Sequence, residues 1–118
     1  MIIAIPIDEN KEKVCVSFGR APYFLFFNTD TNASDVMANS ASQAQGGAGI
    51  KAAQLVADRP ASSLIAVRCG QNAAEVLLAA NIDVYKANGT TVPENLQAFA
   101  EGKLAKLEHF HPGFHGQA

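Results

Sequence analysis

The sequence predicts an α/β fold with a mixed five-stranded sheet and helices on both faces. In the first half, two extended stretches at residues 23–28 and 34–40 are joined by a polar turn, which is typical of antiparallel strands. In the second half, short apolar strands alternate with helical patterns, which is typical of parallel strands with right-handed crossovers. A sheet with both kinds of pairing follows from these two patterns.

The N-terminal half predicts a central strand and a hairpin. Residues 2–7 are almost wholly apolar, as expected of a strand that is covered on both faces. Residues 14–16 are expected to form a short extended segment. Residues 23–28 form a second apolar strand, which the turn cluster 29–32 connects to residues 34–40. We interpret this last stretch as an edge strand because it is polar and has few bulky side chains.

The C-terminal half predicts alternating helices and strands. Residues 41–49 are small and polar, and we expect them to form a mobile loop. Helical spacing predicts a helix over residues 50–58, followed by a buried strand at 63–68. Asn72 is expected to cap the next helix, at residues 73–80.

The last predicted elements are a short strand at residues 83–86 and a final helix. Thr91 and Glu94 have the spacing of a capping box at the start of this helix. The helix is expected to run to about Glu101, and Gly102 suits the position just after it. We therefore predict one α/β domain over residues 1–107 and a flexible, histidine-containing tail at 108–118.

The composition excludes several classes of protein. The 118 residues are 48% hydrophobic and 17% charged, with a net charge of −2 and a pI of about 5.8. Nucleic-acid binders are usually basic, so that class is disfavoured. No apolar run approaches the roughly 20 residues of a membrane helix, and the N-terminus lacks the basic region of a signal peptide. A cytoplasmic location is expected, where cysteines remain free thiols.

Two glycine-containing segments suggest an anion site. Gly19-Arg20 lies between two predicted strands, where a fixed cation can stand beside closely approaching backbone. The cluster 46–49 opens a helix, whose free N–H groups favour anions. Ligands in such sheets bind beyond the carboxyl ends of the parallel strands, where the turn 69–72 is also expected. The alternatives are an ordinary glycine turn and a surface arginine.

The candidate site therefore combines cations with backbone amides. Arg20, Lys51 and Arg68 are the candidate counter-charges. The cofactor-binding candidates are Arg20, Gly47, Ala48, Gly49, Ile50, Lys51, Cys69, Gly70, Gln71 and Asn72.

Cysteines and histidines are weaker candidates for metal ligands. Cys69 lies before a helix start, which can favour a thiolate, although a small buried apolar side chain is the alternative. The same alternative holds for Cys15, and the pair is a weak signal for a soft metal. All three histidines lie in the tail, which suggests either a transition-metal site or a loosely docked tail; they are His109, His111 and His115. No catalytic constellation is present in the sequence, so binding is favoured over enzymatic activity.

Taken in order, six segments of the chain resemble the nitrogenase iron–molybdenum cofactor biosynthesis (dinitrogenase cofactor-binding) family. The matching segments are residues 3–8, 18–24, 47–53, 70–73, 80–85 and 96–104. The resemblance implies a ribonuclease-H-like fold without a nuclease site. It also implies binding, storage or transfer of metal–sulfur clusters, such as the iron–molybdenum cofactor and its precursors.

The small single-domain members of this family include one that holds an anionic molybdenum–copper sulfide cluster without covalent attachment, so the resemblance implies such a cluster here. The sequence departs from the family pattern in two places. Ser17 stands where many relatives have histidine before Phe-Gly-Arg, and Gln45 and Gly46 stand where relatives often have histidine beside the glycine loop. Cations, glycine amides and apolar surface remain, and this set suits non-covalent capture of a sulfide cluster.

Three hypotheses follow for the function. The leading one is a non-enzymatic carrier of a metal–sulfur cluster, molybdenum–copper sulfide first and iron–molybdenum cofactor or precursor second. The next is a small redox or metal-delivery protein in which Cys15, Cys69 and the tail histidines ligate metal directly. The third is a cofactor-free module that binds a partner such as an ATPase.

Overall fold

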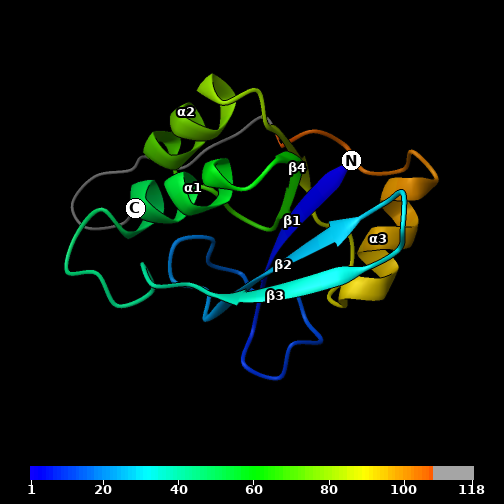
Figure 1. Ribbon diagram of the computed structural model, residues 1–118, viewed down its shortest axis with the longest axis horizontal. Helices are drawn as coiled ribbons and strands as arrows, with labels where there is room; N and C mark the ends of the chain where they lie inside the picture. Colours follow the sequence, from blue (N-terminus) through cyan, green and yellow to red (C-terminus); the bar gives the residue numbers. More distant parts are fainter. Residues whose placement is uncertain (108–118) are drawn as a thin grey trace.

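The computed structural model describes residues 1–107 and contains one five-stranded sheet with the order β3-β2-β1-β4-β5 (Figure 1). The elements in chain order are β1 (Ile2–Ile7), β2 (Tyr23–Asn28), β3 (Ser34–Ala38), α1 (Ala48–Asp58), β4 (Ala61–Ala66), α2 (Gln71–Ala79), β5 (Asp83–Lys86) and α3 (Val92–Ala100). Strand β1 is antiparallel to β2 and parallel to β4, and β5 is parallel to β4. The predicted α/β fold, a ribonuclease-H-like mixed sheet with helices on both faces, is confirmed.

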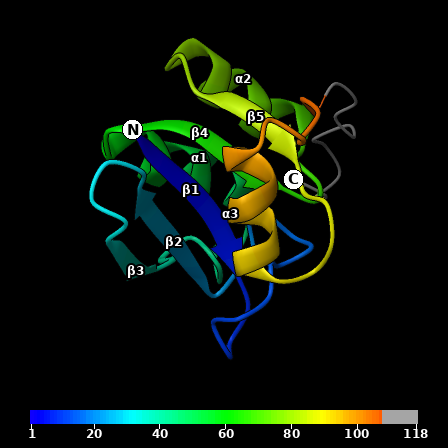
Figure 2. The ribbon, with the colours of Figure 1, turned by 90° about the vertical axis from the view of Figure 1, so that its right-hand side faces the viewer.

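Helices cover the two faces of the sheet unequally (Figure 2). Helices α1 and α2 lie on one face, over a core that includes Ala4, Phe24 and Leu64. Helix α3 lies on the other face, over a core that includes Ile5 and Ile65. The alternation along β1 explains this division, because successive side chains of a strand point to opposite faces.

Pro6 lies in β1 beyond the last position at which β1 pairs with β4. The paired positions of β1 and β4 end at Ala4 and Leu64. Proline has no N–H to donate to a ladder, and the Pro6 carbonyl instead accepts a hydrogen bond from the Cys15 N–H at 2.8 Å. Val14 forms an isolated bridge with Ile7, so the predicted extended segment is present at this point. The end of β1 therefore pairs with this segment beyond the last position at which it pairs with β4.

Several predicted boundaries were wrong by about two residues. Helix α1 begins at Ala48, because Gly47 adopts a left-handed φ of 67° and serves as its N-cap. Strand β3 ends at Ala38 and strand β4 runs from Ala61 to Ala66, each ending two residues before its predicted end. The N-cap of α2 is Gly70 in extended conformation, and Asn72 lies inside the helix.

The ends of α3 agree with the prediction. The Thr91 hydroxyl accepts a hydrogen bond from the Glu94 N–H at 3.4 Å and donates one to the Glu94 carboxylate at 2.7 Å. Gly102 follows the helix with a φ of 72°. Among residues 1–107, no helix is long and apolar enough to cross a membrane. The predicted tail at 108–118 lies outside the described residues.

Candidate functional site

Gly19 lies directly against the first turn of α1. A β-carbon at Gly19 would lie 2.8 Å from the backbone nitrogen of Gly49 and 2.9 Å from its α-carbon. Only glycine permits this approach without displacement of the backbone. The Phe-Gly-Arg loop and the glycine loop, which are far apart in the sequence, therefore form one rim at the carboxyl edge of β1.

Asn39 connects the Phe-Gly-Arg loop of this rim to the segment that follows β3. Its side chain is buried, and its amide nitrogen donates to the carbonyls of Gly19 at 3.1 Å and Ala21 at 2.8 Å. Its amide oxygen accepts a hydrogen bond from the Ala41 N–H at 3.0 Å. All polar atoms of a buried amide need such partners, so Asn39 holds the Phe-Gly-Arg loop against the segment that follows β3.

Arg20 has a structural role in addition to its charge. One guanidinium nitrogen donates to the carbonyls of Ser42 at 3.1 Å and Ala44 at 2.6 Å. The loop that we predicted to be mobile is therefore held at these two points. The side chain is exposed and makes no ion pair with a carboxylate among residues 1–107.

The N-termini of α1 and α2 point to the same edge of the sheet. Helix α1 ends just before β4 begins, and α2 begins just after β4 ends, so both helices start at the carboxyl end of this strand. Their N-caps, Gly47 and Gly70, provide no side-chain hydrogen bond to the first turn. Free N–H groups at such ends favour an anion by about 0.3–1 kcal/mol per charge at exposed sites.

The predicted binding residues differ in accessibility. Lys51, Arg68 and Gln71 are exposed, and Gly47, Ile50 and Asn72 are half-buried. The buried members of the set are Ala48, Gly49, Cys69 and Gly70. Lys51 and Arg68, like Arg20, lack a carboxylate partner in the described part of the chain. The charges of Arg20, Lys51 and Arg68 are therefore not offset by a carboxylate among residues 1–107.

The thiolate interpretation of Cys69 was wrong. The residue is 1% exposed, and burial raises the pKa of its thiol to about 12. Desolvation disfavours the charged thiolate more than the helix start favours it. Cys69 is thus a small buried side chain, and only its backbone remains a binding candidate.

No group of three or more metal-ligating side chains exists among residues 1–107. Cys15 is half-buried and is a free thiol. The histidines His109, His111 and His115 lie outside the described residues. Direct ligation by Cys15 and Cys69 therefore has no supporting cluster in the described part of the chain.

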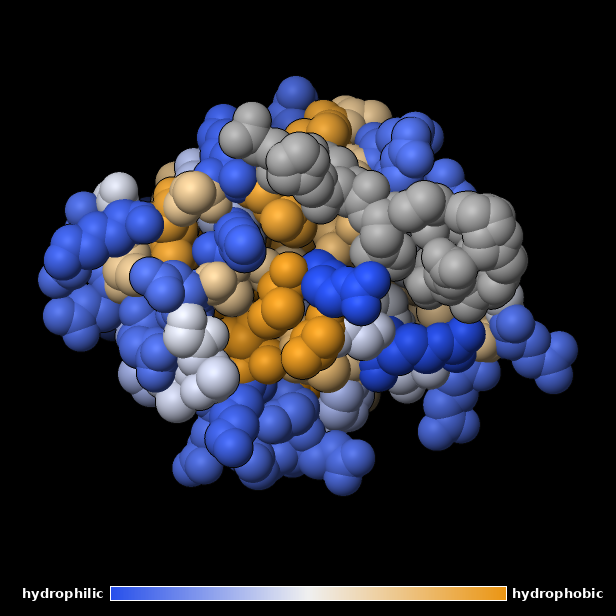
Figure 3. All heavy atoms as spheres, turned by 180° about the vertical axis from the view of Figure 1, so that it is seen from behind, coloured by the Kyte–Doolittle hydropathy of each residue, from blue (hydrophilic) through white to orange (hydrophobic). Residues whose placement is uncertain are grey.

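Apolar surface is also exposed at this edge. Val16 is 58% exposed, and its neighbour Cys15 is half-buried. Val67, which follows the end of β4, is also half-buried. Figure 3 shows hydrophobic side chains gathered into a patch, with hydrophilic residues around it, on the face opposite to that of Figure 1. A groove of about 470 Å³ lies elsewhere, between Phe27 and Phe99, and none of the predicted site residues lines it.

Two polar residues near this edge were not among the predicted binding residues. Asn39 was placed within the edge strand, and its burial was the missing information. Asp8, at the carboxyl end of β1, has a buried carboxylate oxygen with no hydrogen-bond partner among residues 1–107. Its position after an apolar strand was a signal that could have found it.

The sequence profile of the family described as dinitrogenase iron-molybdenum cofactor matches residues 1–102. The chain belongs to this dinitrogenase iron-molybdenum cofactor family. It is 35% identical over 111 residues to an uncharacterized protein of Methanocaldococcus jannaschii, with 92% of each chain covered. The family assignment that the sequence motifs predicted is confirmed.

Solved structures of family members are similar over nearly the whole chain. The apo form of the orange protein from Desulfovibrio gigas matches with a TM-score of 0.84 and 31% identity, over 90% of this chain and 92% of that one. A NifB-like protein from Thermotoga matches with a TM-score of 0.79 and 35% identity, over 96% and 98%. The family and these neighbours support a role in binding a cofactor or cluster related to the iron–molybdenum cofactor.

Proposed function

We propose that this protein binds an anionic metal–sulfur cluster without covalent attachment at the rim of Gly19, Arg20 and the start of α1, and that it is not an enzyme. A molybdenum–copper sulfide cluster is the first candidate. The observation that carries the proposal is the contact between Gly19 and Gly49. Arg20 follows Gly19 directly and makes no ion pair with a carboxylate among residues 1–107, and the N-cap of α1 makes no side-chain hydrogen bond to the first turn.

The chemistry of the rim suits such a cargo. Terminal and bridging sulfides accept hydrogen bonds from N–H groups, and bonds to charged partners contribute about 1.5–3 kcal/mol each. Arg20, Lys51 and Arg68 offset the negative charge of the cluster. The exposed Val16 supplies apolar surface that a large, weakly hydrated cluster can cover.

Reconstitution tests the proposal. Copper(I) and tetrathiomolybdate are added to metal-free protein, which is then desalted and measured by visible spectroscopy and metal analysis. Colour that elutes with the protein, with stoichiometric molybdenum and copper, is the expected result. A colourless, metal-free protein peak would contradict the molybdenum–copper cluster.

Charge variants locate the site. Lys51→Gln is expected to weaken cluster binding several-fold, because it removes a cation at the first turn of α1. Lys103→Gln is the matched control, since Lys103 follows the far end of α3 and pairs with Glu101 at 3.0 Å. Equal losses in both variants would mean that net charge, and not this rim, governs binding.

The family supports a second candidate, a carrier of the iron–molybdenum cofactor or its precursors. The same protein incubated with iron, sulfide and molybdate under anaerobic conditions distinguishes the two cargoes by metal ratio. Retention of cluster by Cys15→Ser protein is expected for either, because neither cargo requires the thiol in this proposal. Failure to retain any cluster would favour a cofactor-free module that binds a partner such as an ATPase.

A further inference from the structure

The outer edge of β3 has no strand partner among residues 1–107, because β3 is the last strand in the sheet order. The hydrogen bonds at the two ends of β3 show which of its backbone N–H and C=O groups point toward β2. The Asn39 N–H donates to the Pro22 carbonyl at 3.0 Å, and the Ala33 carbonyl accepts from Asn28 at 2.8 Å. Since these directions alternate along a strand, the N–H and C=O groups of Ser34, Val36 and Ala38 point outward.

This edge has little of the usual protection against pairing. Natural edge strands are protected by charges, proline, a bulge or shortness, whereas β3 has five residues, pairs with β2 in unbroken register and carries a single charge, that of Asp35. The charge of Asp35 is compensated within the chain, since its carboxylate lies 2.7 Å from the Arg59 guanidinium. Val36 is a large apolar residue that is 40% exposed at the middle of the strand.

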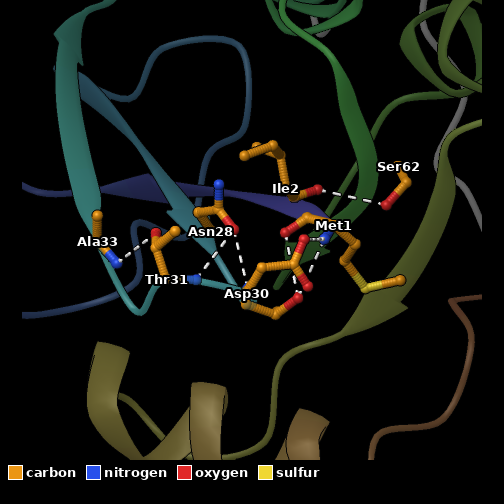
Figure 4. Close-up of polar contacts among 8 residues, drawn as sticks. Met1, Ile2, Asn28, Asp30, Thr31, Ala33 and Ser62 are labelled. Carbon is orange, nitrogen blue, oxygen red and sulfur yellow. Dashed lines mark hydrogen bonds and ion pairs between the residues drawn. The ribbon is translucent and has the colours of Figure 1, made fainter.

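The turn before β3 holds the strand in place (Figure 4). The Asn28 side-chain oxygen accepts from the N–H groups of Asp30 at 2.8 Å and Thr31 at 3.4 Å. The Thr31 hydroxyl accepts from the Ala33 N–H at 3.2 Å, and the N-terminal ammonium lies 3.3 Å from the Asp30 carboxylate. An edge that is already ordered loses little conformational entropy when a partner strand binds.

We propose that β3 pairs with β3 of a second copy of this chain, antiparallel and centred on Val36. In this register Val36 faces Val36 of the other copy, Ser34 faces Ala38, and Asp35 faces Met37. The three outward residues are symmetric about the centre, so each copy offers the same donors and acceptors to the other. Such self-complementarity is what a two-fold interface requires, and it keeps the two Asp35 carboxylates from facing each other.

This pairing leaves the cluster rim open. Ala38, the end of β3 that leads to Asn39, lies beside Ser34 of the other copy, so the two rims lie at opposite edges of the joined sheet. The inference is thus independent of the proposed function, and either can fail while the other holds.

Sedimentation equilibrium over a range of concentrations tests the dimer with cluster-free protein. Wild-type protein is expected to reach twice the chain mass. Val36→Lys is expected to raise the dimer dissociation constant on the order of tenfold or more, because two like charges then face each other. Leu78→Lys is the matched control, since Leu78 is 51% exposed on α2, away from β3. A wild-type monomer throughout, or equal dimerisation of Val36→Lys, would overturn the proposal.

Cross-linking tests the register even if Val36→Lys folds poorly. In a Cys15→Ser background, Val36→Cys is expected to form a disulfide-linked dimer on mild oxidation. Facing residues that exchange hydrogen bonds have α-carbons about 5.5 Å apart, within the disulfide range of about 4.4–6.8 Å. Ser34→Cys is expected to stay monomeric on a denaturing gel, because Ser34 faces Ala38. Equal cross-linking of both variants, or of neither, would overturn the register.

Discussion

Gly19 and Gly49 lie so close that a β-carbon on Gly19 would come within 2.8 Å of the Gly49 backbone nitrogen. This contact joins the loop before β2 to the start of α1. It explains why the Phe-Gly-Arg segment and the glycine cluster, which lie about thirty residues apart, act as one rim.

Replacing Gly19 with alanine is expected to destabilise the protein by about 1–3 kcal/mol, the usual cost of overpacking, and to weaken cluster retention. Urea unfolding measures the first effect and reconstitution the second. Gly46→Ala is the matched control, because a β-carbon there meets nothing within 4 Å. If both variants behave like wild type, the close contact is not important for the rim.

Asn39→Ala is expected to lower the free energy of unfolding by about 1–3 kcal/mol for each buried polar group that it leaves without a partner. It is also expected to loosen the rim. Asn95→Ala provides a comparison, because Asn95 is also fully buried, with its side-chain oxygen 2.7 Å from the Asn88 N–H. Unfolding free energies are expected to fall in both variants, but cluster retention only in Asn39→Ala. Loss of cluster from both would indicate a general effect of instability.

Asp8→Asn is expected to strengthen binding of tetrathiomolybdate with copper, because it removes a negative charge at the carboxyl end of β1. Titration followed by visible absorbance gives the affinity. Asp30→Asn is the control, since Asp30 lies in the turn at the other edge of the sheet and pairs with the N-terminal ammonium. Weaker binding by Asp8→Asn would show that the unpartnered oxygen contacts a cation of the cluster.

The buried thiol of Cys69 predicts a specific pH dependence. Its pKa rises from 9.0 to about 12 in the folded protein. Above pH 9.0 the unfolded chain loses this proton while the folded protein keeps it, so Cys69 lowers stability progressively from about pH 9 to 12. Cys69→Ala is expected to lose less stability than wild type between pH 8 and 10, measured by urea unfolding. Parallel losses in the two proteins would contradict the raised pKa.

Much of the fold was predictable because its signals are local. The apolar run of β1, the turn after β2 and the capping box of α3 depend on residues that are close in sequence. The errors occurred where backbone geometry overrides residue preference. Gly47 starts α1 two residues early through its positive φ, and extended Gly70 takes the capping place expected of Asn72.

By itself, the sequence determined the fold class, the family and the two loops that flank the candidate site, since periodicity and short motifs record these directly. Only the tertiary structure decided the rest. It showed that Arg20 donates to a carbonyl just before the glycine loop, that Asn39 bonds the Phe-Gly-Arg loop, and that Cys69 is buried. These properties depend on contacts between distant segments and on exclusion of water, and neither quantity can be obtained from spacing along the chain.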